Sequence, residues 1–241
     1  MCQICEEKVM GRRRFLGLAG LGLAAGALSL TGGSAAWAAG GPKTTLTADQ
    51  ALAKLKEGNA KFVAGPQLCE ADLVNARAKV SHGQAPWATI VGCADSRVPP
   101  ELVFGGVNVG ELFTARNAGN MVDTATMGTI EYGSGVLGVP LIVVLGHQSC
   151  GAVAAACDAV TKKAKYPGSI GPMVKEIIPA VKAAKNMPGD LVDNVVRESA
   201  KRTAQKIATK SPIISGLVKE GKVKVVAARY DLEKGSVEFF A

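Results

Sequence analysis

Histidine is scarce in this sequence: only His82 and His147 occur among its 241 residues. A catalytic zinc site built from three histidines is therefore excluded within one subunit. Any catalytic zinc site in this chain has to include thiolates, and six cysteines are available to supply them. The shortage of histidine thus makes the cysteines the first residues to consider as ligands.

Two features of proteins that bind nucleic acids or dinucleotides are missing. Aromatic residues make up only 5% of the chain, and although the net charge is +8, the lysines of segments such as 201–210 are not interleaved with aromatic side chains. Because nucleic-acid grooves typically combine positive charge with aromatic stacking, we expect no nucleic-acid partner. The segment 105–119 lacks the G-x-G-x-x-G turn, which excludes an NAD-binding module.

The first 39 residues are typical of a targeting segment. Arginines at 12–14 and Phe15-Leu16 precede a Gly- and Ala-rich apolar run, and 36–38 supplies small residues for cleavage. The Arg-Arg-x-Phe-Leu order resembles a twin-arginine signal, which exports folded proteins. We expect 1–39 to be a signal peptide and the protein to be periplasmic or otherwise exported, without a membrane partner after cleavage. An uncleaved membrane anchor is the alternative, although the apolar run is short for a spanning helix.

Residues 40–241 alternate strand and helix patterns and fit a single domain. The segment 47–63 has apolar residues at helical spacing, with Thr47 as a candidate N-cap and Gly65 as a stop. Short apolar or β-branched runs predict strands at 88–92, 112–115, 141–145, 223–230 and 237–240, and helical patterns occupy 121–137, 151–160, 172–185 and 191–209. The alternation predicts an α/β fold with a mostly parallel central sheet flanked by helices.

Three potential metal ligands follow strand ends in this pattern. Cys93 comes directly after the first strand, His147 follows the strand at 141–145, and Cys150 opens the next helix. Ligands of parallel sheets bind at the carboxyl ends of the strands, and a helix N-terminus favours a thiolate. Zinc takes cysteine sulfur and histidine nitrogen in a tetrahedral set, and three protein ligands leave a position open for water. The pattern therefore predicts a catalytic zinc site.

Each of these residues also has a plainer interpretation. Cys93 could be a small buried residue at a strand end, and His147 could cap the following helix. Asp95 and Arg97 could form only a surface ion pair. In an exported protein Cys93 and Cys150 could instead form a disulfide. Spacing alone leaves these alternatives open.

Three motifs, in this order and at this spacing, resemble those of the β-class carbonic anhydrases. They are Cys-Ala-Asp-Ser-Arg at 93–97, Arg-Asn-Ala-Gly-Asn at 116–120 and His-Gln-Ser-Cys-Gly at 147–151. The resemblance extends from the helix at 47–63 to the segment 230–235 and covers nearly all of the chain after the signal. It implies a β-carbonic anhydrase-like zinc domain over 40–241.

The resemblance implies a function and a cofactor. The reaction is the reversible hydration of carbon dioxide to bicarbonate and a proton by a zinc-bound hydroxide. One Zn²⁺ per subunit would be held by Cys93, His147 and Cys150. Because two thiolates donate more charge than imidazoles, the bound water should be less acidic than at a three-histidine site. We therefore expect activity to rise towards alkaline pH.

Asp95 and Arg97 are implied to act as a catalytic pair. Asp95 either accepts a hydrogen bond from the zinc-bound water or, in a closed form only, becomes the fourth metal ligand. A planar guanidinium paired with Asp95 would hold the carboxylate off the metal. Some members close through a pocket that includes a Trp three residues before the first cysteine ligand, and Ile90 stands there in this chain. We therefore expect the open form.

A substrate pocket and an assembly are also implied. The expected pocket residues are Gln84, Phe113, Ala118, Tyr132 and Gly151. Gln84 is suited to donate a hydrogen bond to substrate oxygens, while Phe113 and Ala118 would form an apolar wall, or could simply pack in the core. The expected assembly is a homodimer or homotetramer with clefts at the subunit interface, in which 47–63 forms an N-terminal helical arm.

Two other functions remain open at this point. The same hydroxide attack would hydrate a sulfur relative of carbon dioxide, such as carbonyl sulfide or carbon disulfide. A permanently closed site with Asp95 as fourth ligand would instead belong to a non-catalytic binding or storage protein. Inactivity at alkaline pH with full zinc would favour this last reading.

Overall fold

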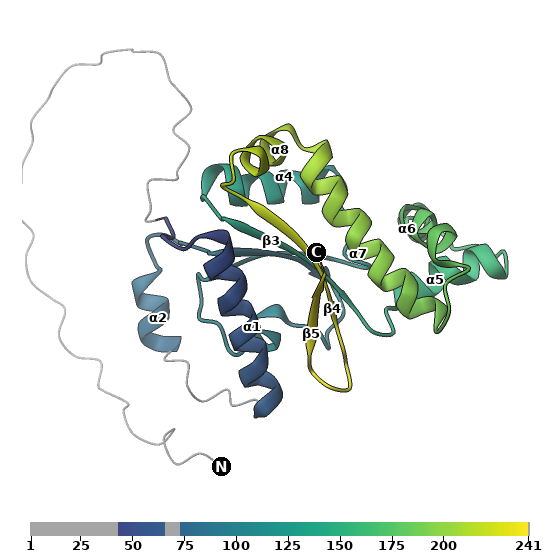
Figure 1. The fold of residues 1–241 in the computed structure, drawn as a ribbon, viewed down its shortest axis with the longest axis horizontal. Helices are drawn as coiled ribbons and strands as arrows, with labels where there is room; N and C mark the ends of the chain where they lie inside the picture. Colours follow the sequence, from purple (N-terminus) through teal and green to yellow (C-terminus); the bar gives the residue numbers. More distant parts are fainter. Residues whose placement is uncertain (1–42, 66–72, 241) are drawn as a thin grey trace, which may run out of the picture. The chain divides into compact units, whose positions relative to one another are not determined.

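The computed structural model describes residues 43–65 and 73–240, which belong to one compact unit, Ala39–Ala241 (Figure 1). The expected signal peptide, 1–39, lies outside the described residues and stays a prediction. Within the described residues, no helix is long and apolar enough to cross a membrane.

A five-stranded sheet forms the centre of the fold, with the strand order β2-β1-β3-β4-β5. The strands are β1 (Ala88–Cys93), β2 (Leu112–Asn117), β3 (Leu141–His147), β4 (Lys224–Tyr230) and β5 (Val237–Phe240). The first four are parallel, and β5 pairs antiparallel with β4. The predicted α/β fold with a mostly parallel sheet is confirmed. The chain proceeds from β1 outward to β2 and, on the other side, from β3 to β4. The carboxyl ends of β1 and β3 therefore form a topological switch point, where α/β sheets bind ligands.

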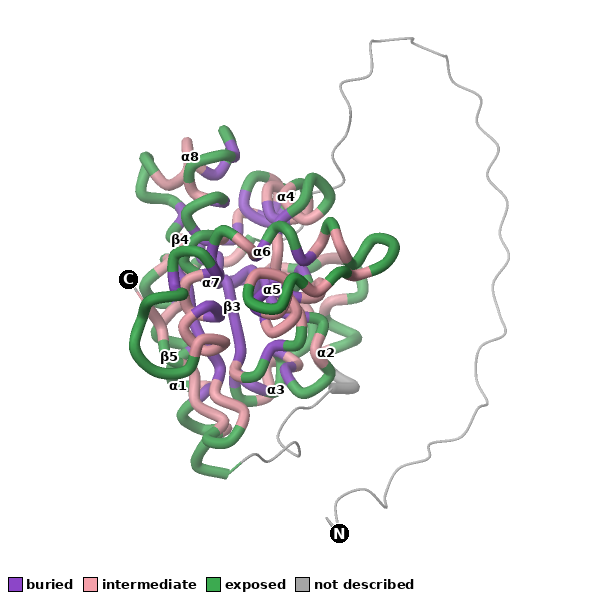
Figure 2. The backbone as a smooth tube through the Cα atoms, turned by 90° about the vertical axis from the view of Figure 1, so that its right-hand side faces the viewer, coloured by how far each residue is buried: buried purple, intermediate pink, exposed green. Residues whose placement is uncertain are grey.

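Helices cover both faces of the sheet. They are α1 (Ala48–Ala64), α2 (Leu73–Lys79), α3 (Pro100–Val103), α4 (Thr124–Glu131), α5 (Gly151–Thr161), α6 (Ile170–Ala184), α7 (Leu191–Lys210) and α8 (Pro212–Lys219). On one face, Leu55 of α1 packs in a cluster with Ile90 and Leu145. On the other face, Ile207 of α7 packs in a cluster with Val144. Figure 2 accordingly shows β3 as buried, which explains why its sequence is a continuous apolar run rather than an alternating one.

The N-terminal helix begins where the sequence predicts. The Thr47 side chain accepts from the Gln50 amide, and the Gln50 side chain accepts from the Thr47 amide, which completes a capping box. A Cβ atom at Gly58 would collide with the carbonyl oxygen of Phe104, so glycine allows α1 to lie against the end of α3. The buried Asn59 donates to the carbonyls of Val103 and Gly235 and accepts from the Val237 amide. These bonds fasten α1 to the end of α3 and to the hairpin between β4 and β5.

One expected helix is divided, and three short ones were not expected. The continuous helix predicted at 121–137 is instead α4 followed by a π-helical turn at Tyr132–Val136. Asp123 caps α4 by accepting from the Thr126 amide, which places the helix start after 121. The short α2, α3 and α8 have too few turns to show apolar periodicity in the sequence.

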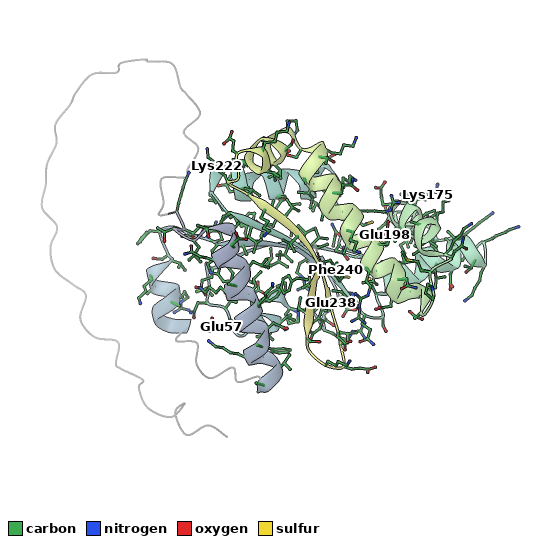
Figure 3. The ribbon with its side chains drawn as sticks, in the orientation of Figure 1. Glu57, Lys175, Glu198, Lys222, Glu238 and Phe240 are labelled. Atoms are coloured by element: carbon green, nitrogen blue, oxygen red, sulfur yellow. The ribbon has the colours of Figure 1, made fainter. Side chains whose placement is uncertain are left out.

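Charged side chains are spread over the elements rather than gathered on one of them. Glu57 on α1, Lys175 on α6 and Lys222 before β4 are exposed and lie on separate parts of the fold (Figure 3). Exposed pairs such as Glu57 with Lys61 contribute little to stability, because solvent screens them. The core clusters on the two faces of the sheet, rather than these ion pairs, therefore hold the site in place.

Candidate metal centre

The three predicted ligands come together at the carboxyl ends of β1 and β3. Cys93 ends β1, His147 ends β3, and Cys150 is the N-cap of α5. Their ligand atoms all lie within 4.8 Å of one another, and all three residues are buried. The two sulfur atoms are 4.0 Å apart, and both cysteines are free thiols. Two thiolates that share one tetrahedral zinc, each about 2.3 Å from it, lie about 3.8 Å apart. The spacing thus fits a shared metal ion and not a disulfide.

The imidazole of His147 is oriented for a metal. Its Nδ1 lies 2.9 Å from the carbonyl oxygen of Gln148. Because a carbonyl only accepts, Nδ1 carries the hydrogen and Nε2 has a free lone pair. Nε2 is buried, and no hydrogen-bond partner for it exists among the described residues. A buried polar atom without a partner requires an explanation, and a metal ion between Nε2 and the two sulfurs provides one.

The two thiols affect each other's protonation. The hydrogen bond between their sulfur atoms, against an opposing effect of burial, lowers the pKa of Cys93. The same bond, together with burial, raises the pKa of Cys150. The Gly119 amide also donates to the Cys93 sulfur, at 3.4 Å. A Cβ atom at Gly119 would lie 2.9 Å from Ile177. The absence of a side chain therefore lets residue 119 pack beside Ile177 while its amide contacts Cys93. The pair therefore loses its first proton readily, and a bound cation would be needed to hold the second thiolate.

Asp95 and Arg97 form a two-point pair beside the ligands. Arg97 Nε donates to Asp95 Oδ1 at 2.9 Å and Nη2 donates to Oδ2 at 2.7 Å, while the Arg97 amide also donates to Oδ1. This pairing holds the pKa of the Asp95 carboxyl well below its usual range. Asp95 Oδ2 lies 3.8 Å from His147 Nε2. The carboxylate is thus ionised, held by the guanidinium and adjacent to the metal ligands.

Arg116 is a contributor that the sequence did not single out. Its Nε donates to the carbonyl of Cys93 at 2.8 Å, and its Nη2 donates to the carbonyl of Asp95 at 2.7 Å. The Ala94 amide in turn donates to the carbonyl of Asn117. These bonds fix the loop that follows β1. The motif at 116–120 was the signal that could have pointed to Arg116.

The expected pocket residues fall into two groups. Ala118 precedes the amide that contacts Cys93, and the exposed Gly151 follows Cys150, so both lie at the metal centre.

The other three lie towards the opposite ends of the strands. Phe113 pairs with Thr89, four residues before Cys93 along β1, which corresponds to about 13 Å. The centroids of the Tyr132 and Phe113 rings are 6.2 Å apart. Gln84 is exposed and comes before the start of β1, whereas Cys93 is at the end of that strand. A single chain therefore does not place these three residues around its own metal ligands.

A cavity of about 920 Å³ lies between the end of β2, α4 and α6. Its lining includes Met121, Met127 and Met173 and the charged residues Glu176 and Lys206. The three predicted metal ligands are not part of the lining of this cavity.

Comparison with known proteins gives consistent matches. A sequence model of the carbonic anhydrase family matches residues 88–237. "Carbonic anhydrase 2" of Mycobacterium tuberculosis is 39% identical over 181 residues, which cover 75% of this chain and 87% of that protein. Among solved structures, a β-carbonic anhydrase of Aspergillus fumigatus matches with a TM-score of 0.61 and 27% identity, covering 80% of this chain and 89% of that one. A β-carbonic anhydrase of Sordaria macrospora, described as tetrameric, has the same fold, with a TM-score of 0.61, 24% identity and coverage of 68% and 85%.

Proposed function

This chain belongs to the β-class carbonic anhydrases, and we propose that it hydrates carbon dioxide reversibly through one zinc ion per subunit, held by Cys93, His147 and Cys150. The observation that carries the proposal is the unpartnered, buried Nε2 of His147, which lies with two sulfur atoms inside a 4.8 Å cluster. A bound zinc ion would supply a water molecule that is nucleophilic near neutral pH. The cluster offers three ligands, as catalytic zinc sites do.

Asp95 and Arg97 are proposed to orient the attacking water. The Asp95 carboxylate is ionised, so it accepts hydrogen bonds and does not donate them. Accepting one from the water would direct the water's lone pair at the carbon of carbon dioxide. Both carboxylate oxygens are hydrogen-bonded to Arg97, which keeps the carboxylate beside the cluster and supports an open site. Ala118 and Gly151 would border the substrate.

The function is tested by measuring carbon dioxide hydration and zinc content on one sample of purified protein. We expect one zinc per chain and a hydration rate that rises several-fold between about pH 7 and pH 9, because thiolate ligands raise the pH at which the water ionises above the reference value near 7. A rate independent of pH over this interval would contradict the role of the two thiolates. Full zinc without hydration at any pH would mean a closed Asp95 site or a different substrate.

Gln84, Phe113 and Tyr132 are proposed to complete the cleft of a second subunit. They lie away from the ligands of their own chain, and Tyr132 is exposed. A homodimer in which each chain contributes its metal centre and lends these residues to its partner would bring both sets together. A homotetramer built from such dimers would do the same.

Mixed assemblies test this arrangement. Cys150→Ser would lack a metal centre but keep Tyr132, and Tyr132→Ala would lack the lent ring but keep its metal. If each variant is inactive alone, co-expression should restore about a quarter of wild-type activity, because half of the dimers are mixed and each has one complete cleft. No gain in activity on co-expression would refute the shared cleft. So would a fully active wild-type protein that light scattering shows to be a monomer.

Export is proposed from the sequence alone, since 1–39 lies outside the described residues. The twin-arginine-like signal addresses folded proteins. Folding before export would let the thiolates bind metal first, so that they would not be free to oxidise in a disulfide-forming compartment.

A further inference from the structure

Two of the three metal ligands are joined by a turn of only two residues, Gln148 and Ser149. Ser149 has a φ of 54°, in the left-handed region that non-glycine residues rarely adopt. A conformation of this kind persists only where the surroundings restrain it. The turn between His147 and Cys150 therefore needs restraint from outside itself.

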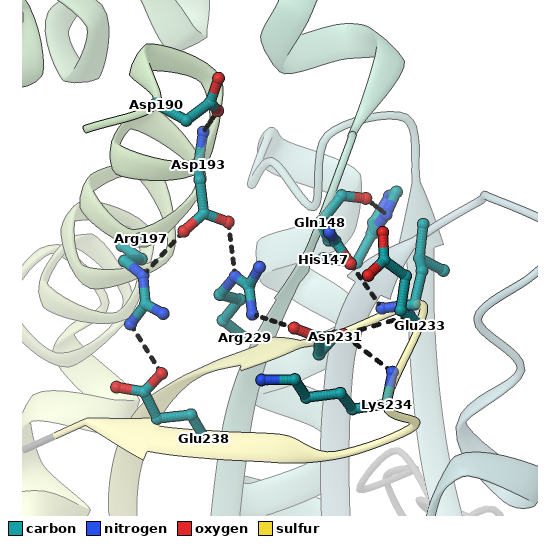
Figure 4. A network of polar contacts seen from close by, with 11 residues as sticks. His147, Gln148, Asp190, Asp193, Arg197, Arg229, Asp231, Glu233, Lys234 and Glu238 are labelled. Atoms are coloured by element: carbon teal, nitrogen blue, oxygen red, sulfur yellow. Dashed lines mark hydrogen bonds and ion pairs between the residues drawn. The ribbon is translucent and has the colours of Figure 1, made fainter.

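Gln148 makes three polar contacts, and two of them connect the turn to a segment outside it. Its carbonyl accepts the hydrogen of His147 Nδ1. Its amide donates to the carbonyl of Tyr230 at 2.9 Å, and its side-chain Oε1 accepts from the Leu232 amide at 3.0 Å (Figure 4). The peptide that orients the imidazole is thus held from both the main chain and the side chain of Gln148. Both outer contacts go to the start of the turn between β4 and β5.

The partner segment is itself fixed. Asp231 accepts from the amides of Glu233 and Lys234 and from Arg229 Nη1. Arg229 is mostly buried, and its Nε donates to Asp193 on α7 at 2.6 Å. Figure 4 shows this chain of contacts extending from the turn at His147 to α7. The Gln148 side chain therefore binds to a rigid support.

We propose that Gln148 is a positioning residue for the metal ligand His147: its side-chain bond to Leu232 holds the carbonyl that fixes the imidazole's orientation and its protonated nitrogen. The inference rests on the proposed zinc function. Groups that hold a metal-bound histidine from its far nitrogen typically change metal affinity about 10- to 100-fold when they are lost. Here the support is less direct: the side chain of Gln148 holds its own backbone carbonyl, and that carbonyl holds the imidazole of His147.

The test compares Gln148→Leu, which has a similar size but no acceptor, with Gln148→Glu, which keeps an acceptor for the Leu232 amide. We expect Gln148→Leu to lose zinc to a chelator about 10-fold faster than wild type, and its cobalt-substituted form to show a shifted absorption spectrum. Gln148→Glu should stay within about 3-fold of wild type, since it retains the acceptor. Gln205→Leu, on the exposed face of α7, serves as the matched control.

The outcomes are distinct. If Gln148→Leu lowers the melting temperature but releases zinc at the wild-type rate with an unchanged cobalt spectrum, its role is structural and the proposal is overturned. If Gln148→Leu does not fold, Gln148→Asn, whose shorter side chain cannot reach Leu232, takes its place with the same expectation. Wild-type protein that fails to bind zinc would overturn the proposed function itself, whereas tight zinc in both wild type and Gln148→Leu overturns only the positioning role.

Discussion

Replacing Cys150 by serine is expected to remove zinc from the protein and to lower the hydration rate on the order of a thousandfold or more, since the metal is what makes water nucleophilic near neutral pH. Serine has nearly the shape of cysteine but presents an alcohol that stays protonated. Cys150 is almost fully buried, at 1% exposed, at the start of α5. Its loss leaves Cys93 and His147, which are too few ligands for a stable catalytic site.

Cys157→Ser is the matched control for this change. Cys157 lies on α5, the helix that Cys150 caps, and is also a buried free thiol, but its sulfur is not part of the ligand cluster. It should keep one zinc per chain and its activity. Zinc content, hydration rate and circular dichroism on the same preparations separate loss of metal from loss of fold. Full zinc and activity in Cys150→Ser would exclude this cysteine as a ligand.

The sequence was informative about the parts of the fold that repeat a pattern. β1 and β3 are buried on both faces, so their continuous apolar runs could be recognised without a structure. The N-cap at Thr47 depends only on neighbouring residues, so it could also be predicted. The metal ligands could be proposed because strand ends in a parallel sheet meet at one edge.

Contacts between distant segments were not predictable in this way. The bond from Leu232 to Gln148 joins residues 84 positions apart, and Arg116 reaches the carbonyls of Cys93 and Asp95 across 23 and 21 positions. Nothing in the local pattern encodes such contacts, because they depend on the register of neighbouring strands. The placement of Phe113 far from the cluster likewise follows from its pairing with Thr89.

Replacing Arg97 by glutamine is expected to close the metal site. The change removes both charged hydrogen bonds that hold Asp95, and Asp95 Oδ2 already lies 3.8 Å from His147 Nε2. The freed carboxylate would then compete for the fourth position of the metal. Arg97 is about half exposed, so solvent screens its pair with Asp95 and limits the effect of losing it. We therefore expect the fraction of open sites, and with it the hydration rate, to fall roughly 10- to 100-fold. Zinc content should remain at one per chain.

This pattern, activity lost while zinc is kept, separates Arg97 from Cys150. Arg97→Lys should fall between wild type and Arg97→Gln, because an ammonium restores charge but not the planar two-point contact. Arg202→Gln is the matched control, since Arg202 forms a similar pair with Glu198 on the surface of α7. A small inhibitory anion should bind Arg97→Gln more weakly than wild type if the carboxylate occupies the fourth position. Unchanged anion binding together with reduced activity would show instead that Arg97 acts on the substrate, and that Asp95 stays off the metal without it.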